Sequence, residues 1–353
     1  MFHFPMATRR YALLGAASFL TLAVTSCDPD DEVTPVTPPV TTQTVYVVNE
    51  GPFLTGSGSV SVFSKATKEV QKDPFLAANG RGVGNVLQSM TIVGDNAYLV
   101  ANNSNWVEVV TLADFKSVKK ITGLSQPRYL VQVAPNKAYL TEWQGNFTSG
   151  YTAGRVSVLD LTTNTVTKTI PVGINPEQLT VAGGKVYVAN SDGNTLTVIN
   201  PTTDAVEGTV TVPAGPKNVT TDASGNVWVL SDDYTEPLAS LVRFSPGTPT
   251  QQTRITFPED YRNGNLRVNG AGDKIYVGLA TGVYQLPITA TSLPTTPLIR
   301  RSFYGLGIDP QDNTIYAGTG SFSADGRVVR FSATGAAVDS FAVGIAPNGF
   351  LFK

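Results

Sequence analysis

The chain has 353 residues, of which 41% are hydrophobic and 15% are charged, and its formal net charge at pH 7 is −2. That length and apolar content allow a sizeable core, and the abundance of Thr, Val and Gly indicates an all-β protein. Two of the 25 basic and four of the 27 acidic residues lie among the first 32, so the remainder carries 23 of each. A nucleic-acid-binding protein needs a basic stripe to neutralise phosphates. The chain has none, which argues against that class.

Residues 1–26 have the pattern of a lipoprotein signal peptide. Arg9 and Arg10 precede an apolar run, Tyr11–Val24, that is too short to span a bilayer but typical of a signal sequence. The run leads into the letters VTSC, in which Cys27, the only cysteine of the chain, has the position of the lipidated residue of a lipobox. We therefore expect Cys27 to be acylated and to anchor the protein to a membrane. An ordinary secretory signal with an incidental cysteine is the alternative.

Residues 27–44 read as a tether. The letters DPDDE directly follow the cysteine, and a Pro/Thr-rich stretch comes next. An acidic cluster in this place resembles the surface-export signal of Bacteroidetes lipoproteins, which implies the outer face of the outer membrane; a solvated spacer is the alternative. At ~3.1 Å per residue the stretch after Cys27 could extend roughly 50 Å. We expect it to hold the folded part away from its membrane.

Residues 45–353 contain a repeated pattern. An aromatic residue between two hydrophobic ones is followed by a polar turn and an alternating strand, as in VYVANSDGNTLTVINPTTDAVEGTVTV. Seven such units, spaced 40 to 52 residues apart, predict an all-β fold, a seven-bladed β-propeller. The repeated aromatic positions are Tyr46, Tyr98, Tyr139, Tyr187, Trp228, Tyr276 and Tyr316.

The two ends of this region predict how the ring closes. The first unit starts at its second strand, with the letters TVYVVNEG, and has no first strand of its own. After the last unit the chain continues as IAPNGFLFK, in which Pro347 stands where Pro176 stands in INPEQLTV. We expect Asn348–Phe352 to complete the first blade, because closure removes open sheet edges.

Long loops follow the second strand of each unit, on the same face as the loops that lead into the first strand. They differ from unit to unit, and variable loops on a rigid scaffold usually carry binding. We expect their aromatic residues to form a surface for a bulky, partly apolar ligand or a protein partner, with packing over the blade ends as the alternative. These residues are Phe53, Trp106, Trp143, Phe147, Tyr151, Tyr234 and Phe322.

The starts of the first strands predict a polar ring at the mouth of the central channel. Its donors, acceptors and few charges of both signs suit a ligand rich in amide, hydroxyl and phosphate groups; water-filled channel lining is the alternative. We predict ligand contacts for Trp106, Trp143 and every ring member except Ser89 and Asn265. The ring comprises Gln88, Ser89, Arg128, Tyr129, Glu177, Gln178, Lys217, Asn218, Asn265, Tyr304 and Asn348.

The residue types restrict the chemistry. The only histidine is His3, in the signal segment, and the only cysteine is Cys27. Imidazole or thiolate metal sites, Ser-His-Asp hydrolysis and cysteine nucleophiles are therefore excluded. A carboxylate pair of Glu142 and Glu177 at the mouth would leave acid/base catalysis or a calcium site open. We expect a binding protein with no catalytic residue, metal or cofactor.

Two stretches carry a family resemblance: VGNVLQSMTIVGDNAYLVANNSNWVEVV and VSVLDLTTNTVTKTIPVGINPEQLTVAGGKVYVANSDGNTLTVI. Over residues 44–353 the chain resembles YncE-like propellers with the YVTN repeat and, more narrowly, the DUF5074-type surface lipoproteins of Bacteroidetes. Those include BtuG-type propellers, which capture cobalamin beside a TonB-dependent outer-membrane transporter.

The resemblance implies capture of a cobamide or another bulky nutrient for such a transporter. Because the repeats specify the fold and not the ligand, two other functions stay open. One is adhesion to a protein or glycan, and the other is a carboxylate-dependent hydrolase or lyase.

Overall fold

The computed structural model describes residues 43–232, 238–257 and 264–353. The predicted signal peptide, Cys27, residues 28–42 of the predicted tether and Tyr234 lie outside these residues, whereas Thr44, the last residue assigned to the tether, belongs to the first strand. The stretch from Thr41 to Lys353 forms one compact unit. Within the described ranges, no helix has the length and apolar character needed to cross a bilayer.

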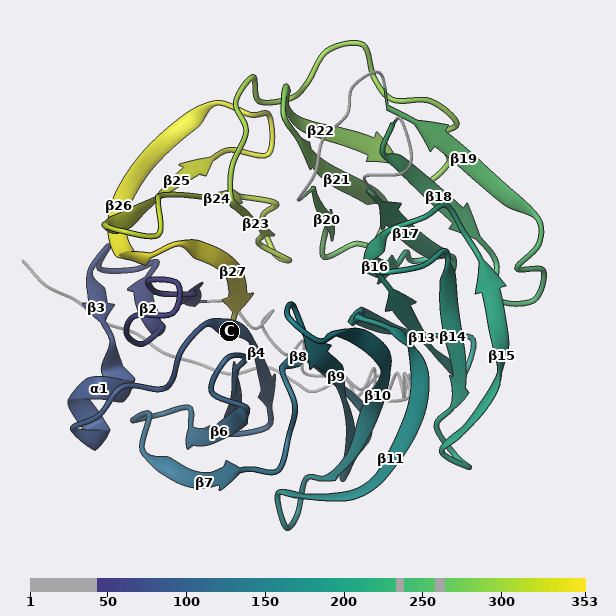
Figure 1. The fold of residues 1–353 in the computed structure, drawn as a ribbon. Coiled ribbons are helices and arrows are strands. Elements are labelled where there is room, and N and C mark those ends of the chain that lie inside the picture. Colours follow the sequence, from purple (N-terminus) through teal and green to yellow (C-terminus); the bar gives the residue numbers. More distant parts are fainter. Residues whose placement is uncertain (1–42, 233–237, 258–263) are drawn as a thin grey trace, which may run out of the picture. The chain divides into compact units, whose positions relative to one another are not determined.

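Seven antiparallel sheets are arranged around a central axis, which confirms the predicted seven-bladed propeller (Figure 1). The first four blades, each listed from its innermost strand outward, are as follows. Blade one is β27 (Pro347–Phe352), β1 (Thr44–Asn49), β2 (Ser59–Ser64), β3 (Val70–Lys72); blade two is β4 (Leu87–Val93), β5 (Asn96–Ala101), β6 (Trp106–Thr111), β7 (Ser117–Ile121); blade three is β8 (Pro127–Ala134), β9 (Lys137–Asn146), β10 (Gly150–Asp160), β11 (Thr165–Ile174); blade four is β12 (Pro176–Ala182), β13 (Lys185–Asn190), β14 (Thr195–Asn200), β15 (Ala205–Thr211).

The last three blades follow the same order, except that blade six has three strands instead of four. Its strand β22 forms only an isolated bridge, Val283 to Ile299, where a fourth strand would pair. Pro294 and Pro297 lie in that segment, and proline cannot donate to a strand ladder. Blade five is β16 (Pro216–Thr221), β17 (Val227–Ser231), β18 (Ser240–Phe244), β19 (Gln252–Thr256); blade six is β20 (Asn265–Val268), β21 (Lys274–Leu279), β22 (Gly282–Pro287); blade seven is β23 (Gly305–Ile308), β24 (Ile315–Thr319), β25 (Asp325–Phe331), β26 (Ala337–Ile345).

The repeated aromatic residue of each second strand is structural. All seven are buried. The hydroxyl of Tyr98 in blade two donates to Asn164 Oδ1 of blade three at 2.7 Å. The hydroxyl of Tyr139 in blade three donates to Asp204 of blade four. The rings of these two tyrosines therefore fill the space between blades, while their hydroxyls stay hydrogen-bonded.

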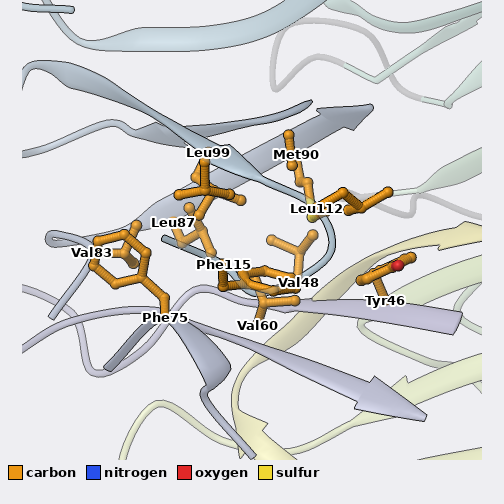
Figure 2. Packing of buried hydrophobic residues seen from close by; sticks show 12 residues of the cluster. Tyr46, Val48, Val60, Phe75, Val83, Leu87, Met90, Leu99, Leu112 and Phe115 are labelled. Atoms are coloured by element: carbon orange, nitrogen blue, oxygen red, sulfur yellow. The ribbon is translucent and has the colours of Figure 1, made fainter. Parts of the chain in front are cut away.

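Apolar side chains from neighbouring blades interlock to form the core. Between blades one and two, Val48, Leu87 and Leu99 are all at most 1% exposed and lie in one cluster (Figure 2). The short helix α1 (Pro74–Asn79) adds Phe75 to this cluster and is capped by Asp73, whose carboxylate accepts from the Leu76 amide at 3.1 Å. The blades thus bury their faces against one another.

The C-terminal strand closes the ring as predicted. Strand β27 pairs antiparallel with β1, with Leu351 opposite Tyr46. On its other side the rings of Phe350 and Phe352 contact Tyr316 of blade seven, at centroid distances of 6.1 and 5.3 Å. The last residues of the chain therefore hold the first and last blades together.

Candidate functional site

A repeated backbone device positions the ring at the channel mouth. Several inner strands begin with a proline that follows a residue of positive φ, such as Asn175 (φ 49°) before Pro176. The register against the second strand then shifts within the next residues, as between Pro176 and Leu179. Such a β-bulge sets extra residues against the partner strand and changes the direction of their side chains. Consecutive residues such as Glu177 and Gln178 can therefore both face the channel. The same shift occurs in β4, β8 and β16.

Together these strands form a cavity of about 800 Å³ at the centre of the ring. The structure brings together in its lining every member of the predicted polar ring. Of the predicted loop aromatics, Phe53, Trp143, Tyr151 and Phe322 line it too. That these residues bind a ligand remains a prediction. The ring members are Gln88, Ser89, Arg128, Tyr129, Glu177, Gln178, Lys217, Asn218, Asn265, Tyr304 and Asn348.

Trp106 does not line this cavity. It is the first residue of β6, where its indole Nε1 donates to the Val83 carbonyl at 2.9 Å. The Lys120 ammonium lies over its ring, 4.0 Å from the centroid. Phe147 is also absent from the lining and is 92% exposed. The two predicted tryptophans therefore have different surroundings.

Trp143 reaches the cavity because the expected loop of blade three is a β-hairpin extension. Strands β9 and β10 continue past the edge of the other blades, and Tyr151 pairs with Gly145. Trp143 and Tyr151 meet edge to face at 5.2 Å, and the indole Nε1 donates to the Pro176 carbonyl at 3.2 Å. The Arg128 guanidinium lies over the Trp143 ring, 4.4 Å from its centroid.

Arg128 organises one side of the cavity. Its Nη2 donates to Glu177 Oε1 at 2.8 Å, its Nε to Oε2 at 3.2 Å, and its Nη1 to Gln88 Oε1 at 2.6 Å. Gln88 in turn donates to the Tyr129 hydroxyl at 3.0 Å. Burial raises the pKa of Glu177, although the charge and hydrogen bonds of Arg128 oppose that effect. This is a fork-shaped, charge-assisted pair of the kind that holds side chains in a fixed geometry.

Sequence reasoning missed Glu50. It follows β1, and its carboxylate accepts from the Tyr304 hydroxyl and from Asn348 Nδ2, both at 2.8 Å. Burial raises the pKa of Glu50 despite these hydrogen bonds, and burial followed by the charge of Glu50 raises that of Tyr304. A signal was present: Glu50 stands four residues after the repeated aromatic of its blade, as do the cavity residues Asn102 and Trp143.

Arg267 was missed as well, because blade six is offset in the sequence alignment of the units. It lies on β20 and lines the cavity. Its Nε donates to the Leu306 carbonyl and its Nη1 to the Leu266 carbonyl, both at 2.7 Å. Two residues earlier, on the same face of β20, Asn265 donates to the Tyr304 carbonyl at 3.2 Å.

Glu142 does not join Glu177 in the cavity lining. Its fully buried carboxylate accepts from Arg155 Nη2 at 2.8 Å, from the Ser125 amide at 2.6 Å and from the Ser157 hydroxyl. The residue belongs to β9, before the point where the strand extends beyond the other blades, so it stays inside the sheet. Over the described ranges, no group of three or more His, Cys, Asp or Glu residues could hold a metal ion.

Comparison with solved structures shows the propeller fold. A functionally unknown protein from Desulfotomaculum acetoxidans is 14% identical, with a TM-score of 0.66, and the match covers 88% of this chain and 99% of that one. A periplasmic gluconolactonase from Pseudomonas aeruginosa is 11% identical, with a TM-score of 0.65 and coverages of 87% and 99%. A putative 6-phosphogluconolactonase from Bacteroides fragilis is 12% identical, with a TM-score of 0.61 and coverages of 92% and 100%. At these identities the likeness concerns the fold alone.

No curated protein matches the chain. A family model does match, that of the domain of unknown function DUF5074, over residues 43–352. This span includes all seven blades and the closing strand. The chain therefore belongs to the DUF5074 family.

Proposed function

We propose that the protein captures a bulky nutrient of the corrinoid class in its central cavity and serves a TonB-dependent outer-membrane transporter. The observation that carries this proposal is the cavity lining, which contains both aromatic rings and side-chain amide groups. Its volume of about 800 Å³ lies in the range of small-molecule sites. A corrinoid combines an apolar macrocycle with many amide arms, so it would use both kinds of lining.

The rings supply two apolar walls. Trp143 and Tyr151 form one, and Phe322 and Tyr304, with ring centroids 5.5 Å apart, form the other. Tyr304 and Phe322 are 37% and 45% exposed, so apolar area is available for a ligand to cover. Covering it contributes roughly 25 cal/mol per Å².

The amides supply acceptors without partners. Asn218 Oδ1 and Asn348 Oδ1 are buried, line the cavity and accept no hydrogen bond within the described part of the chain. Leaving such an atom unsatisfied costs about 1–3 kcal/mol. Once these two side chains turn toward a ligand, the N–H groups of its amide arms would recover that free energy, which supports a ligand rich in primary amides.

Binding without catalysis is part of the proposal. The two carboxylates of the lining are engaged, Glu177 by Arg128 and Glu50 by Tyr304 and Asn348. These hydrogen bonds orient the carboxylate oxygens as acceptors for a ligand. They also keep each carboxylate bonded to neighbouring donors, so the proposal gives neither an acid/base role.

The location is proposed from the sequence alone. The lipobox at Cys27 and the acidic letters DPDDE support a lipid anchor at the outer face of the outer membrane. Around the mouth, Phe147, Leu54 and Phe53 are 92%, 69% and 60% exposed. Exposed apolar groups of this kind suit contact with a partner protein, and the same observation favours the second candidate function, adhesion.

The test uses the compact unit from Thr41 to Lys353, mixed with cyanocobalamin and passed over a desalting column. Coloured protein is expected. Trp143→Ala should lose at least about tenfold in affinity, since tryptophan is a frequent binding hot spot. Trp106→Ala is the matched control, because that tryptophan lies outside the cavity lining, and it should stay coloured. Colourless unaltered protein would reject corrinoid capture and turn attention to glycans and proteins.

A further inference from the structure

Arg267 holds a position that a threonine fills elsewhere in the ring. In blade two, Thr91 Oγ1 donates to the Leu130 carbonyl of the next inner strand at 2.8 Å. In blade six, Arg267 Nε donates to the Leu306 carbonyl of the next inner strand at 2.7 Å. The preceding contacts of the two blades correspond as well, because Ser89 and Asn265 each donate to a carbonyl of the next blade. A neutral hydroxyl can therefore make the tie between blades, and the charge of Arg267 is not needed for it.

The other cations of the cavity are neutralised. Arg128 is bonded to Glu177, and Lys217 is bonded to Asp232. Arg267 forms no ion pair with any acidic residue of the described ranges, and its hydrogen bonds go to two main-chain carbonyls. Burial lowers the pKa of Arg267, and Tyr129 is the group that opposes this effect. Among the residues that the structure describes, the cavity thus holds one guanidinium that lacks a counter-charge.

The geometry of that guanidinium leaves donors available. Arginine has five N–H donors in a planar fork, and the bonds to Leu306 and Leu266 use Nε and Nη1. The Nη2 edge is left for a ligand. Planar, paired donors match the oxygens of a phosphate or carboxylate, and such charge-assisted pairs are roughly twice as strong as neutral hydrogen bonds.

We infer that Arg267 is the subsite for an oxyanion group, a phosphate or a carboxylate, carried by the captured ligand. This inference rests on the proposed function and narrows its ligand class. The carboxylates of the cavity, Glu177 and Glu50, are bonded to Arg128 and to Tyr304 with Asn348, so the anion binds on the blade-six side. The rest of the ligand occupies the aromatic and amide lining.

The first arm of the test needs no knowledge of the nutrient. Melting of the full-length protein in detergent is measured with sodium phosphate or with sodium acetate, each against sodium chloride of equal ionic strength. Phosphate, acetate or both should raise the melting temperature of the unaltered protein and of Arg254→Gln, which removes an exposed arginine of β19. Arg267→Thr, which copies the residue of blade two, should show no such rise. The anion that acts identifies the source of the oxyanion.

The second arm compares cyanocobalamin with dicyanocobinamide, which has the same macrocycle but lacks the phosphodiester and nucleotide. The unaltered protein should bind cyanocobalamin at least about tenfold more tightly, and Arg267→Thr should remove that preference. The absence of any anion-specific melting shift, or an equal shift in Arg267→Thr, would overturn the inference, as would an unchanged preference. If corrinoids fail to bind but the phosphate or acetate shift depends on Arg267, the proposed nutrient is wrong and the oxyanion subsite stands.

Discussion

Ring closure by β27 predicts that the fold depends on the last eight residues of the chain. Deleting residues 346–353 removes the inner strand of blade one and opens an edge of β1. It also takes the rings of Phe350 and Phe352 from Tyr316. An exposed edge strand invites pairing with another chain, so the truncated protein should either unfold or associate.

The structure gives the size of the effect. Full burial of a phenylalanine contributes about 1.5–3 kcal/mol, and each of these two rings is partly exposed, so each contributes about half of that. The main-chain bonds lost include those from the Thr44 and Gln43 amides to the Lys353 carbonyl, at 2.8 and 3.0 Å. Each contributes about 1 kcal/mol net. The two rings and these two bonds together contribute about 3.5–5 kcal/mol, which reaches the lower end of the free energy of unfolding of an ordinary domain, about 5–15 kcal/mol.

The assay is size-exclusion chromatography with thermal unfolding followed by circular dichroism. We expect aggregates or oligomers and loss of the cooperative transition, with partial recovery when a peptide of the deleted sequence is added. Lys353→Ala is the control, since it changes only an exposed side chain and keeps the main-chain bonds of residue 353 to Gln43 and Thr44. A monomeric truncated protein with unchanged melting would refute closure by β27 as a source of stability.

Three further predictions follow from single residues. Glu142→Ala should lower the free energy of unfolding by about 2–4 kcal/mol, since Arg155 and the Ser125 amide lose their partner; denaturant titration measures this, and corrinoid binding by the folded protein should be unchanged. The raised pKa of Glu50 means that the native state binds its proton more tightly than the unfolded chain. This contribution is present below the ordinary value near 4.5 and is lost as the pH rises through the native value. Melting curves from pH 4 to 8 should therefore show a smaller decline in Glu50→Gln than in the unaltered protein; parallel curves would contradict this. Trp143→Ala should keep its free energy of unfolding within about 1 kcal/mol of that of the unaltered protein while its affinity for the ligand falls. If the free energy of unfolding and the free energy of binding fell by equal amounts, Trp143 would be assigned to the fold.

The repeat was accessible from the sequence because it is local. Every blade contains a buried second strand, and the period-two pattern around Tyr187 or Tyr276 predicts such a strand directly. The first unit lacks its first strand, and the chain continues past the last unit with a strand that starts at Pro347. Together these two observations predicted that the C-terminal strand closes the ring. The strand starts also predicted that Arg128 and Glu177 face the channel, because all the inner strands run in the same direction around it.

Only the tertiary structure decided which side chains meet. Glu142 and Trp143 are adjacent in sequence, yet one is sealed inside the sheet by Arg155 while the other lies in the cavity. Trp106 and Trp143 fall in corresponding segments of the sequence repeat, yet one lies on β6 under Lys120 and the other on β9 under Arg128. Alternation along a strand gives a side chain's face, whereas its partners come from neighbouring strands of the same blade or from other blades.

The same reason explains why Glu50 and Arg267 escaped prediction. The bond from Glu50 to Asn348 joins residues 298 positions apart, and the one from Arg267 to Leu306 depends on the register between two blades. Periodicity along the chain determined seven blades, a closed ring and a polar mouth. The balance of charge within that mouth, which leaves Arg267 without a carboxylate among the described residues, arose only when the blades came together around one axis, because it depends on distances between residues remote in sequence.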